Sequence, residues 1–383
     1  MSSSSLPSTT APGPDARVRV WWSPAARWSR VLVVLALGAC AHRPPPQYAR
    51  ARAAAERAYS AGRYEEAAER WLDAAQSASK RSDEVEARYR AATSWQRAGR
   101  LDEAQVLLSA IAQDPPSDRS ARAAFDRAEL LVDRGQEAEG QAARNAAIMQ
   151  YPESGVARQA LLREIGWHRD HGGVAAALAY LDRMEPRLAR SELGETVGYE
   201  RGRLLEEAGE RIAARDEYLR VARKYPYPGG ALWDDALFRA AELEVALGHP
   251  REAIAICKEM LSYREPQLTY GSLERPRFGD ARYLMGRIYA DELGDLQAAR
   301  ETFLTLAREH PTSRLRDDAL WAAALADRRA GDMDAVCQDV AELAREIPDS
   351  RYVDCASQLC PRRPPTGHGC RPYILRDIPR PDD

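Results

Sequence analysis

The sequence predicts an all-α chain built from about eight helix-turn-helix repeats, and three regularities in its 383 residues lead to this fold class. Glycines recur, mostly 36 or 37 residues apart, where a turn would separate two helices. A small residue follows each glycine after five positions, and a proline follows most of them after seventeen. Ala, Arg, Glu and Leu dominate the composition, which favours helices throughout. The glycines are Gly62, Gly99, Gly135, Gly172, Gly209, Gly248, Gly294 and Gly331.

Residues 1–39 are predicted to be an export signal. Their apolar run is preceded by arginines and is too short to span a bilayer, which takes about 20 residues. The segment from Leu37 to Cys40 resembles the lipobox of bacterial lipoproteins. The resemblance implies that the chain is cut before Cys40, that Cys40 carries the lipid, and that Ala41 after it directs the protein to the outer membrane. An ordinary secretory signal that ends near Cys40 is the alternative.

Residues 40–47 are expected to form a tether, because Pro44, Pro45 and Pro46 favour an extended polyproline II segment. The repeats would follow from 48 to 350. In each repeat the small residue allows close approach of two helices, and the proline ends the second helix. The small residues are Ala67, Ala104, Gly140, Ala177, Ala214, Ala253, Ala299 and Val336. Larger residues nine positions after the glycine are Trp71, Leu108, Leu181, Tyr218 and Phe303, and the prolines are Pro116, Pro152, Pro226, Pro311 and Pro348.

These offsets resemble the second half of the tetratricopeptide repeat (TPR), in which Ala, an aromatic residue and Pro follow the turn at the same spacings. The resemblance implies a right-handed α-solenoid in which each helix pair buries its apolar face only against its neighbours. The pattern departs in copy three, where Arg144 holds the aromatic position, in copy four, which lacks the proline, and in the long spacing from Gly248 to Gly294.

Two segments, 225–248 and 310–332, resemble the repeats of bacterial envelope TPR lipoproteins. That group includes the lipoprotein of the outer-membrane barrel assembly machine, the Tol-Pal coordinator and the pilotin-like lipoproteins of type IV pili. The resemblance implies a periplasmic adaptor, anchored to the outer membrane, that binds and positions proteins of the cell envelope. A peptidoglycan-associated structural or regulatory module without catalysis is the alternative.

An aromatic row is the candidate binding surface. It occupies the fifth position of the first helix of the repeats, which in TPR arrays faces the concave groove, and would bind a peptide segment there. Packing between helices is the alternative for these rings. An insertion from Ser262 to Gly279 lengthens one connection nearby. The row consists of Tyr89, Phe125, Tyr199, Phe238, Tyr283 and Trp321.

Cysteines gather near the end of the chain, where residues 351–383 are expected to form a Cys- and Pro-rich cap and tail. In the oxidising compartment that the export signal implies, Cys337, Cys355, Cys360 and Cys370 are candidates for disulfides. A metal site made of Cys355, Cys360, His368 and Cys370 is the alternative. Cys257 is expected to be a buried thiol, because it occupies the larger-residue position of its repeat.

No enzyme signature is present among the motifs GxSxG, HExxH, GxGxxG and the P-loop. His168 and His171 lie three residues apart, but no third metal ligand is near and a solvated helix end is the simpler interpretation. Without residues 1–39, which hold four Arg and one Asp, the net charge changes from −3 to −6 and forms no basic stripe. We therefore expect no catalytic residue, cofactor, metal, nucleic acid or small-molecule substrate.

Overall fold

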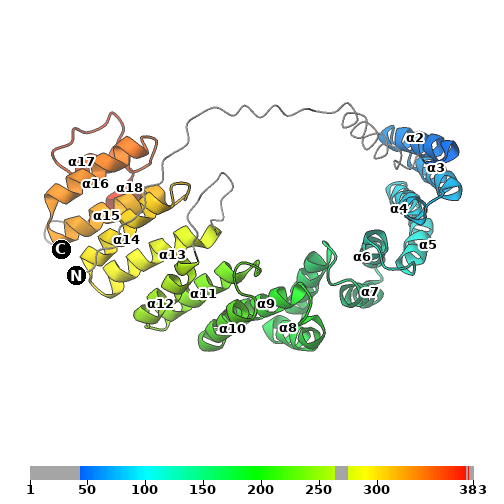
Figure 1. Cartoon of the computed structure of the whole chain (residues 1–383), viewed down its shortest axis with the longest axis horizontal. Helices are drawn as coiled ribbons and strands as arrows, with labels where there is room; N and C mark the ends of the chain where they lie inside the picture. The colour runs from blue at the N-terminus through cyan, green and yellow to red at the C-terminus, as the bar shows by residue number, and fades with distance from the viewer. Residues whose placement is uncertain (1–43, 264–274, 377, 379–383) are drawn as a thin grey trace, which may run out of the picture. The chain divides into compact units, whose positions relative to one another are not determined.

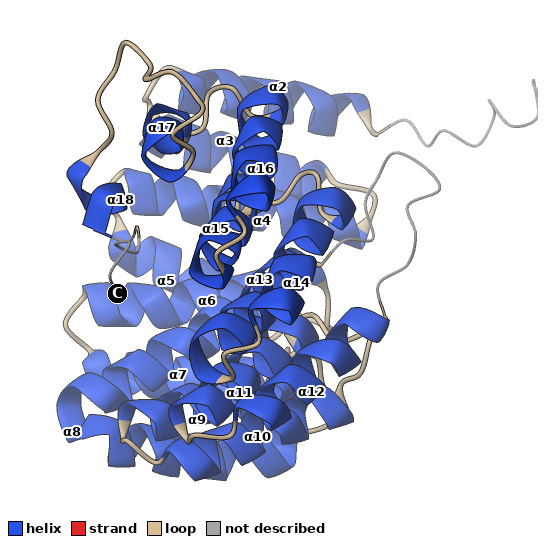
Figure 2. Ribbon diagram, turned by 90° about the vertical axis from the view of Figure 1, so that its left-hand side faces the viewer, coloured by secondary structure: helices blue, strands red, loops and turns tan. Residues whose placement is uncertain are grey.

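The computed structural model describes residues 44–263, 275–376 and 378, and every regular element in these ranges is a helix (Figures 1 and 2). The predicted all-α fold class is confirmed. The chain forms two compact units, one ending at Ala104 and one beginning at Gln105, and each is described by itself. Within the described ranges, none of the helices combines the length and the apolar character that crossing a bilayer requires.

The helices follow one another as eight pairs, which we number repeats one to eight; the first member of a pair is helix A and the second is helix B. Helices A are α2 (Pro46–Ser60), α4 (Arg81–Arg97), α6 (Asp118–Asp133), α9 (Leu193–Glu207), α11 (Trp233–Ala246), α13 (Pro276–Arg287) and α15 (Arg316–Ala330). Helices B are α3 (Tyr64–Ser77), α5 (Leu101–Ala112), α7 (Glu137–Gln150), α10 (Arg211–Lys224), α12 (Pro250–Ser262), α14 (Leu296–Glu309) and α16 (Met333–Glu346). Repeat four is a single element, α8 (Ala157–Leu188), interrupted by a kink.

The first helix begins at Pro46, two residues before the predicted start of the repeats. Pro45 is extended, with φ −53° and ψ 141°, as expected for the tether. The prediction was wrong for Pro46, which takes the first helical position. A proline fits there because the first amide of a helix has no partner within the helix. The signal segment and Cys40 lie outside the described residues.

Seven of the eight predicted turn glycines adopt a left-handed conformation, with φ between 67° and 81°. Such a φ is strained for any residue with a Cβ, so glycine is required at each turn. In repeat four the prediction of Gly172 was wrong, because Gly173 takes φ 71° instead. Helix A of this repeat extends through Gly172 and helix B starts directly after Gly173, which is why α8 is a single element with a kink.

The small residue in every repeat is buried, as predicted. Repeat three shows the limit of the available space. A Cβ on Gly140 would lie 2.5 Å from Cγ2 of Val132 and 2.9 Å from the carbonyl oxygen of Ala128. Glycine is therefore needed here, although the other repeats accommodate an alanine or a valine.

Prolines end the B helices as predicted. In repeats three, five, seven and eight the helix stops two residues before the proline, and in repeat two it stops four residues before it. The physical reason is the missing amide and the clash of the ring with the preceding turn. In repeat four, which has no proline at this position, helix B ends at Leu188.

Acidic side chains join consecutive repeats at their loops. The carboxylate of Glu195, in repeat five, accepts hydrogen bonds from the backbone N–H groups of Ala231 (3.0 Å) and Leu232 (2.8 Å), at the start of α11. No side chain of repeat six caps α11 itself. In the same way Asp234 of repeat six accepts from the backbone N–H of Arg277 (3.4 Å), at the start of α13. The unpaired amides of these helix starts are thus satisfied by the preceding repeat.

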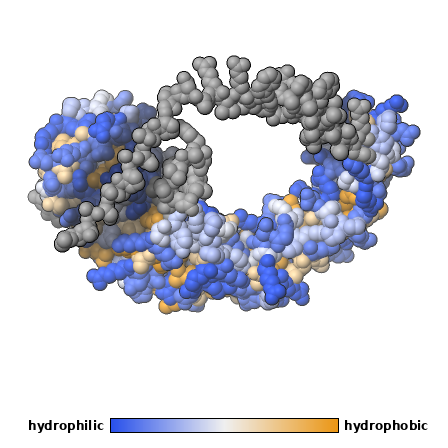
Figure 3. All heavy atoms as spheres, in the orientation of Figure 1, coloured by the Kyte–Doolittle hydropathy of each residue, from blue (hydrophilic) through white to orange (hydrophobic). Residues whose placement is uncertain are grey.

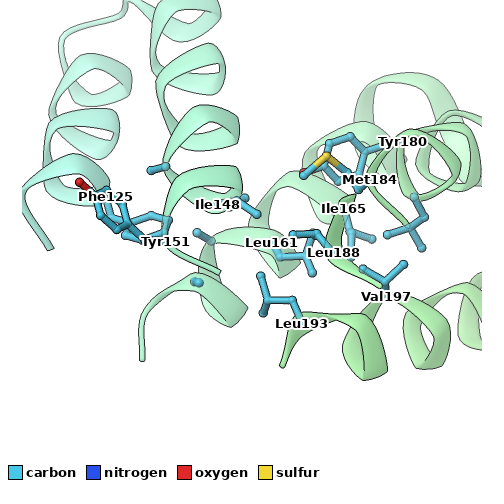
Figure 4. Packing of buried hydrophobic residues seen from close by; sticks show 14 of the residues in the cluster. Phe125, Ile148, Tyr151, Leu161, Ile165, Tyr180, Met184, Leu188, Leu193 and Val197 are labelled. Carbon is cyan, nitrogen blue, oxygen red and sulfur yellow. The ribbon is translucent and has the colours of Figure 1, made fainter. Parts of the chain in front are cut away.

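Within the second unit, the buried clusters span neighbouring repeats. Figure 4 shows the packing of repeats three to five, where Leu161 and Leu188 from the two halves of α8 meet Leu193 of α9. All three are at most 3% exposed. In repeats three to five, neighbouring helix pairs therefore bury their apolar faces against one another, which is the stabilising arrangement of a repeat protein.

The irregular spacing from Gly248 to Gly294 has two structural causes. The connection after α12 is long, and a π-helical turn, η1 (Ile288–Glu292), extends helix A of repeat seven. The predicted insertion was too long at its end, because α13 begins at Pro276 and Phe278 is fully buried. The proline at the first helical position marks this start.

Two disulfides close the end of the array. They join Cys337 to Cys360 and Cys355 to Cys370, which are the four cysteines expected to pair, and they leave no thiolate for the alternative metal site. The cap that they hold contains η2 (Val353–Cys355), α17 (Ala356–Leu359) and α18 (Pro372–Arg376). Leu359 and Ile374 of the cap pack with Val340 of repeat eight. Cys257 is a free buried thiol, as predicted.

Candidate functional site

Three of the six rings in the predicted aromatic row are buried. Tyr89, Phe125 and Trp321 are 7%, 4% and 3% exposed. Trp321 stacks on Tyr352 of the cap with ring centroids 4.9 Å apart. These three rings are part of the core, which is the alternative that the sequence left open.

The other three rings are only partly buried, and the structure brings two of them together. Phe238 of α11 and Tyr283 of α13 line one cleft on the A helices of repeats six and seven. Tyr199 lies outside the lining of that cleft and packs against Tyr218 of its own repeat, at a centroid distance of 5.4 Å. The candidate site is therefore narrower than the predicted row.

This repeat-seven cleft has a volume of about 480 Å³ and an apolar floor surrounded by charges. Its residues come from α11, α13, η1 and the segment before α15. They are Phe238, Glu242, Val245, Arg277, Asp280, Tyr283, Leu284, Arg287, Ile288, Asp291, Glu292, Arg314 and Leu315.

Arg277 links the floor of the cleft to its rim. Its guanidinium lies over the ring of Phe238, 5.1 Å from the centroid, a distance suited to a cation–π interaction. The same group pairs with Asp235 (2.7 Å) and Asp280 (2.8 Å). Asp280 also lies 3.6 Å from the highly exposed Arg314. The rim is thus a connected set of ion pairs that remains accessible to water.

Tyr283 is held between the core and the rim. Its ring packs against the buried Phe303, with centroids 5.4 Å apart. Burial, and then the nearby carboxylate of Asp318, raise the pKa of Tyr283, so that its hydroxyl stays protonated and can donate a hydrogen bond. One turn further along, Arg287 pairs with Asp291 at 2.6 Å.

The charged rim was missed in the sequence, although a signal was present. Arg277 and Asp280 are three residues apart, and Arg287 and Asp291 are four apart, which are the spacings of side-chain pairs on one helix face. What the sequence did not indicate is that both pairs surround the same two rings.

The first unit carries a separate cleft of about 300 Å³ on repeats one and two. Tyr48, Tyr59 and Trp71 contribute rings to it, and the ion pairs Arg52–Glu56 (2.8 Å) and Arg90–Glu86 (2.9 Å) lie beside them. It resembles the repeat-seven cleft in composition. The prediction missed it because these rings do not occupy the fifth position of a helix A.

Among the residues that the structure describes, no group of three or more His, Cys, Asp and Glu side chains could hold a metal ion. His168 stacks on Tyr180 at 4.6 Å, and His171 stacks on Trp167 at 4.3 Å. Burial is the main cause of the lowered pKa of His168. Both histidines therefore contribute to packing on α8.

On the face shown in Figure 3, hydrophilic residues dominate and apolar residues lie scattered among them. On this face, local clefts are therefore better candidates for binding than a broad apolar patch.

Repeated helix pairs with glycine turns, and clefts on their A helices, define an α-helical repeat protein whose fold suggests a scaffold for protein–protein interaction. Residues 280–313, from within α13 to the turn after α14, match the family model described as a tetratricopeptide repeat. This stretch contains the turn, the small Ala299, Phe303 and Pro311 of repeat seven.

Similar solved structures include TPR proteins. PilF from Pseudomonas aeruginosa is 16% identical and covers 63% of this chain and 98% of its own, with a TM-score of 0.36. The C-terminal part of a TPR protein from Cytophaga hutchinsonii is 15% identical over 70% of this chain and 98% of that one, with a TM-score of 0.38. YrrB is described as a TPR protein with an unusual peptide-binding site. It is 16% identical, the match covers 56% of this chain and 97% of YrrB, and the TM-score is 0.36. These likenesses are too distant to support any inference about partners. No curated protein matches the chain significantly.

Proposed function

We propose that this chain is a non-enzymatic adaptor that binds a segment of a partner protein in the repeat-seven cleft. The observation that supports it is the juxtaposition of Phe238 and Tyr283, which come from different repeats and line one cleft. Aromatic and arginine side chains are the residues that most often dominate binding energy at protein interfaces. Arg277, which already lies over Phe238, adds the third group of this kind.

The cleft determines what kind of segment fits. Its apolar floor, with Leu284, Ile288 and Leu315 beside the rings, suits one or two apolar side chains. The rim holds three arginines and four carboxylates, so a segment with charges of both signs around its apolar residues would be complementary. Because the Arg287–Asp291 pair is exposed to water, it can exchange partners at little cost in free energy, whereas the Arg277–Asp280 pair is partly buried.

We also propose that the adaptor acts in the bacterial cell envelope, anchored to the outer membrane through Cys40 and binding envelope proteins. The support is the signal-like segment 1–39 and the Leu37–Cys40 motif. A chain tethered in this way would present its repeats directly after the proline segment.

The binding proposal predicts that Phe238→Ala and Tyr283→Ala each weaken partner binding by about 2 kcal/mol or more, roughly 30-fold in Kd. A photo-crosslinking residue in place of Leu284 would first capture the partner in native envelopes, and calorimetry with the purified partner would then give the affinities. The melting temperatures of these two variants should fall less than that of a variant that lacks a fully buried ring, because removing such a ring costs about 3 to 5 kcal/mol.

Tyr199→Ala is the matched control, since this ring belongs to the same predicted row and lies outside the cleft. If Tyr199→Ala weakens binding as much as Tyr283→Ala does, or if the two cleft variants bind normally once folded, the repeat-seven cleft is not the binding site.

The anchor predicts that wild type incorporates labelled palmitate and that Cys40→Ala does not. The variant should also appear as a soluble, folded protein, because the first helix begins only at Pro46. Equal labelling of the two proteins would refute lipidation at this cysteine and leave the cleft proposal untouched.

A further inference from the structure

Two buried carboxylates share one arginine at the junction of repeats seven and eight. Arg300 of α14 donates from Nε to Oδ2 of Asp327 on α15 (2.7 Å) and from Nη2 to Oδ1 of Asp339 on α16 (3.0 Å). Asp327 is 5% exposed and Asp339 is 2% exposed. Three helices from two repeats therefore meet at a single guanidinium.

The charges at this junction do not balance if both acids are ionised. One guanidinium neutralises one carboxylate, and the second would remain as a buried negative charge, which is costly. In addition, Oδ2 of Asp339 is buried and has no hydrogen-bond partner within the described part of the chain. A proton on one of the two acids would remove the excess charge and supply the missing donor.

We propose that Asp327 and Asp339 share a single proton in the folded chain, and that losing it as the pH rises loosens the junction between repeats seven and eight. The charged groups that face Asp339 from the helices packed on α16 are Arg300 of α14 and Asp327 of α15. When two neighbouring carboxyl groups cannot both ionise, one of them keeps its proton at a pH well above the usual carboxyl pKa.

The direction of the pH effect follows from the same groups. Burial first, and then hydrogen bonding and repulsion from Asp327, raise the pKa of Asp339 to about 7, against the opposing charge of Arg300. An unfolded Asp titrates near 4. The contribution to stability is therefore complete below about pH 4 and is lost as the pH rises through about 7, opposite to an ordinary ion-paired carboxylate.

The junction is close to the cap. Asp339 lies two residues after Cys337, whose disulfide to Cys360 holds α17. A looser α16 would therefore also loosen the attachment of the cap. The proton would thus control how firmly α16 and the cap are held at the C-terminal end of the array.

The test compares the full wild-type chain with Asp339→Asn and Asp327→Asn between pH 5 and pH 8. Each asparagine is neutral at every pH and can donate the missing hydrogen bond. Glu342→Gln is the control, because Glu342 is an exposed acid on the same helix. The measurements are thermal melts, hydrogen–deuterium exchange of α16 corrected for the intrinsic rate, and the infrared band of protonated carboxyl groups.

Wild type and Glu342→Gln are expected to lose several degrees of melting temperature between pH 5 and pH 8. Exchange in α16 should become roughly a hundredfold faster, because about two pKa units separate pH 5 from a pKa of about 7. Either asparagine variant should lose most of this dependence. A protonated carboxyl band should persist to near neutral pH in wild type and be weaker in both asparagine variants, which keep only the contribution of other buried acids such as Glu200 and Asp234, whose pKa burial also raises. If wild type shows no such band above pH 5, or if the asparagine variants keep the full pH dependence, the shared proton is refuted. Should one variant fail to fold, the difference in the band between wild type and the other asparagine variant decides.

Discussion

Replacing Glu164 with alanine is expected to destabilise the chain by about 3 to 5 kcal/mol, because it removes the buried carboxylate that pairs with the buried guanidinium of Arg144 and leaves only the partly exposed Glu129. Arg144 occupies the position where most repeats have an apolar or aromatic side chain, and it is only 5% exposed. Its guanidinium donates to Glu129 (3.0 Å) and to Glu164, which is fully buried. Glu164 also accepts from Asn145 (2.9 Å), so one substitution breaks one buried and one partly buried hydrogen bond.

Chemical denaturation of purified variants measures this effect. Asp170→Ala, which removes an exposed acid from the same helix, should change the unfolding free energy by less than about 1 kcal/mol. The double variant Arg144→Leu/Glu164→Leu should recover much of the loss, because repeats two and four already carry Leu108 and Leu181 at this position. A loss below about 1 kcal/mol for Glu164→Ala would mean that Glu129 alone satisfies the arginine.

Removing the disulfides is the second large effect. The disulfide between Cys355 and Cys370 closes a loop with a sequence separation of 15, and the one between Cys337 and Cys360 closes a loop with a separation of 23. Replacing either pair of cysteines with serine removes that loop constraint. The chain-entropy model gives about 3 kcal/mol for each. Because Leu359 and Ile374 of the cap pack on repeat eight, we expect the end of the array to open before the rest.

Thermal melts with and without reductant check this prediction. The variant Cys257→Ala should respond to reductant as wild type does, since this cysteine is free and buried. Burial raises the pKa of its thiol to about 12, so it does not supply a thiolate for exchange near neutral pH. An identical melting temperature in both conditions would contradict a stabilising role for the disulfides.

The sequence was sufficient for the repeat architecture because each repeat meets the same local demands. A left-handed turn needs glycine, a helix crossing needs a small side chain, and a helix end tolerates proline. It misplaced one turn where two glycines are adjacent, at Gly172 and Gly173. Handedness is a property of the whole array, and the right-handed solenoid stays a prediction.

The candidate site was predicted less well, because burial depends on neighbours that are far away in sequence. Tyr89, Phe125 and Trp321 share a helix position with Phe238 and Tyr283, yet the first three are covered by other elements. The position of a residue in a helix predicts the direction of its side chain but not how deeply other elements bury it. Likewise Arg144 appeared to break the pattern, and its buried partner lies 20 residues further along the chain.

The acidic links between repeats give the array a direction. Glu195 completes the start of α11, and Asp234 completes the start of α13, so each helix depends on the repeat before it. A chain shortened from its C-terminal end would leave such an acid facing water, where a carboxylate is well solvated. A chain shortened from its N-terminal end would instead expose helix amides that have lost their acceptor. Repeats five, six and seven are therefore suited to form in the order in which they leave the ribosome, because repeats five and six each supply the acceptor for the start of the next repeat.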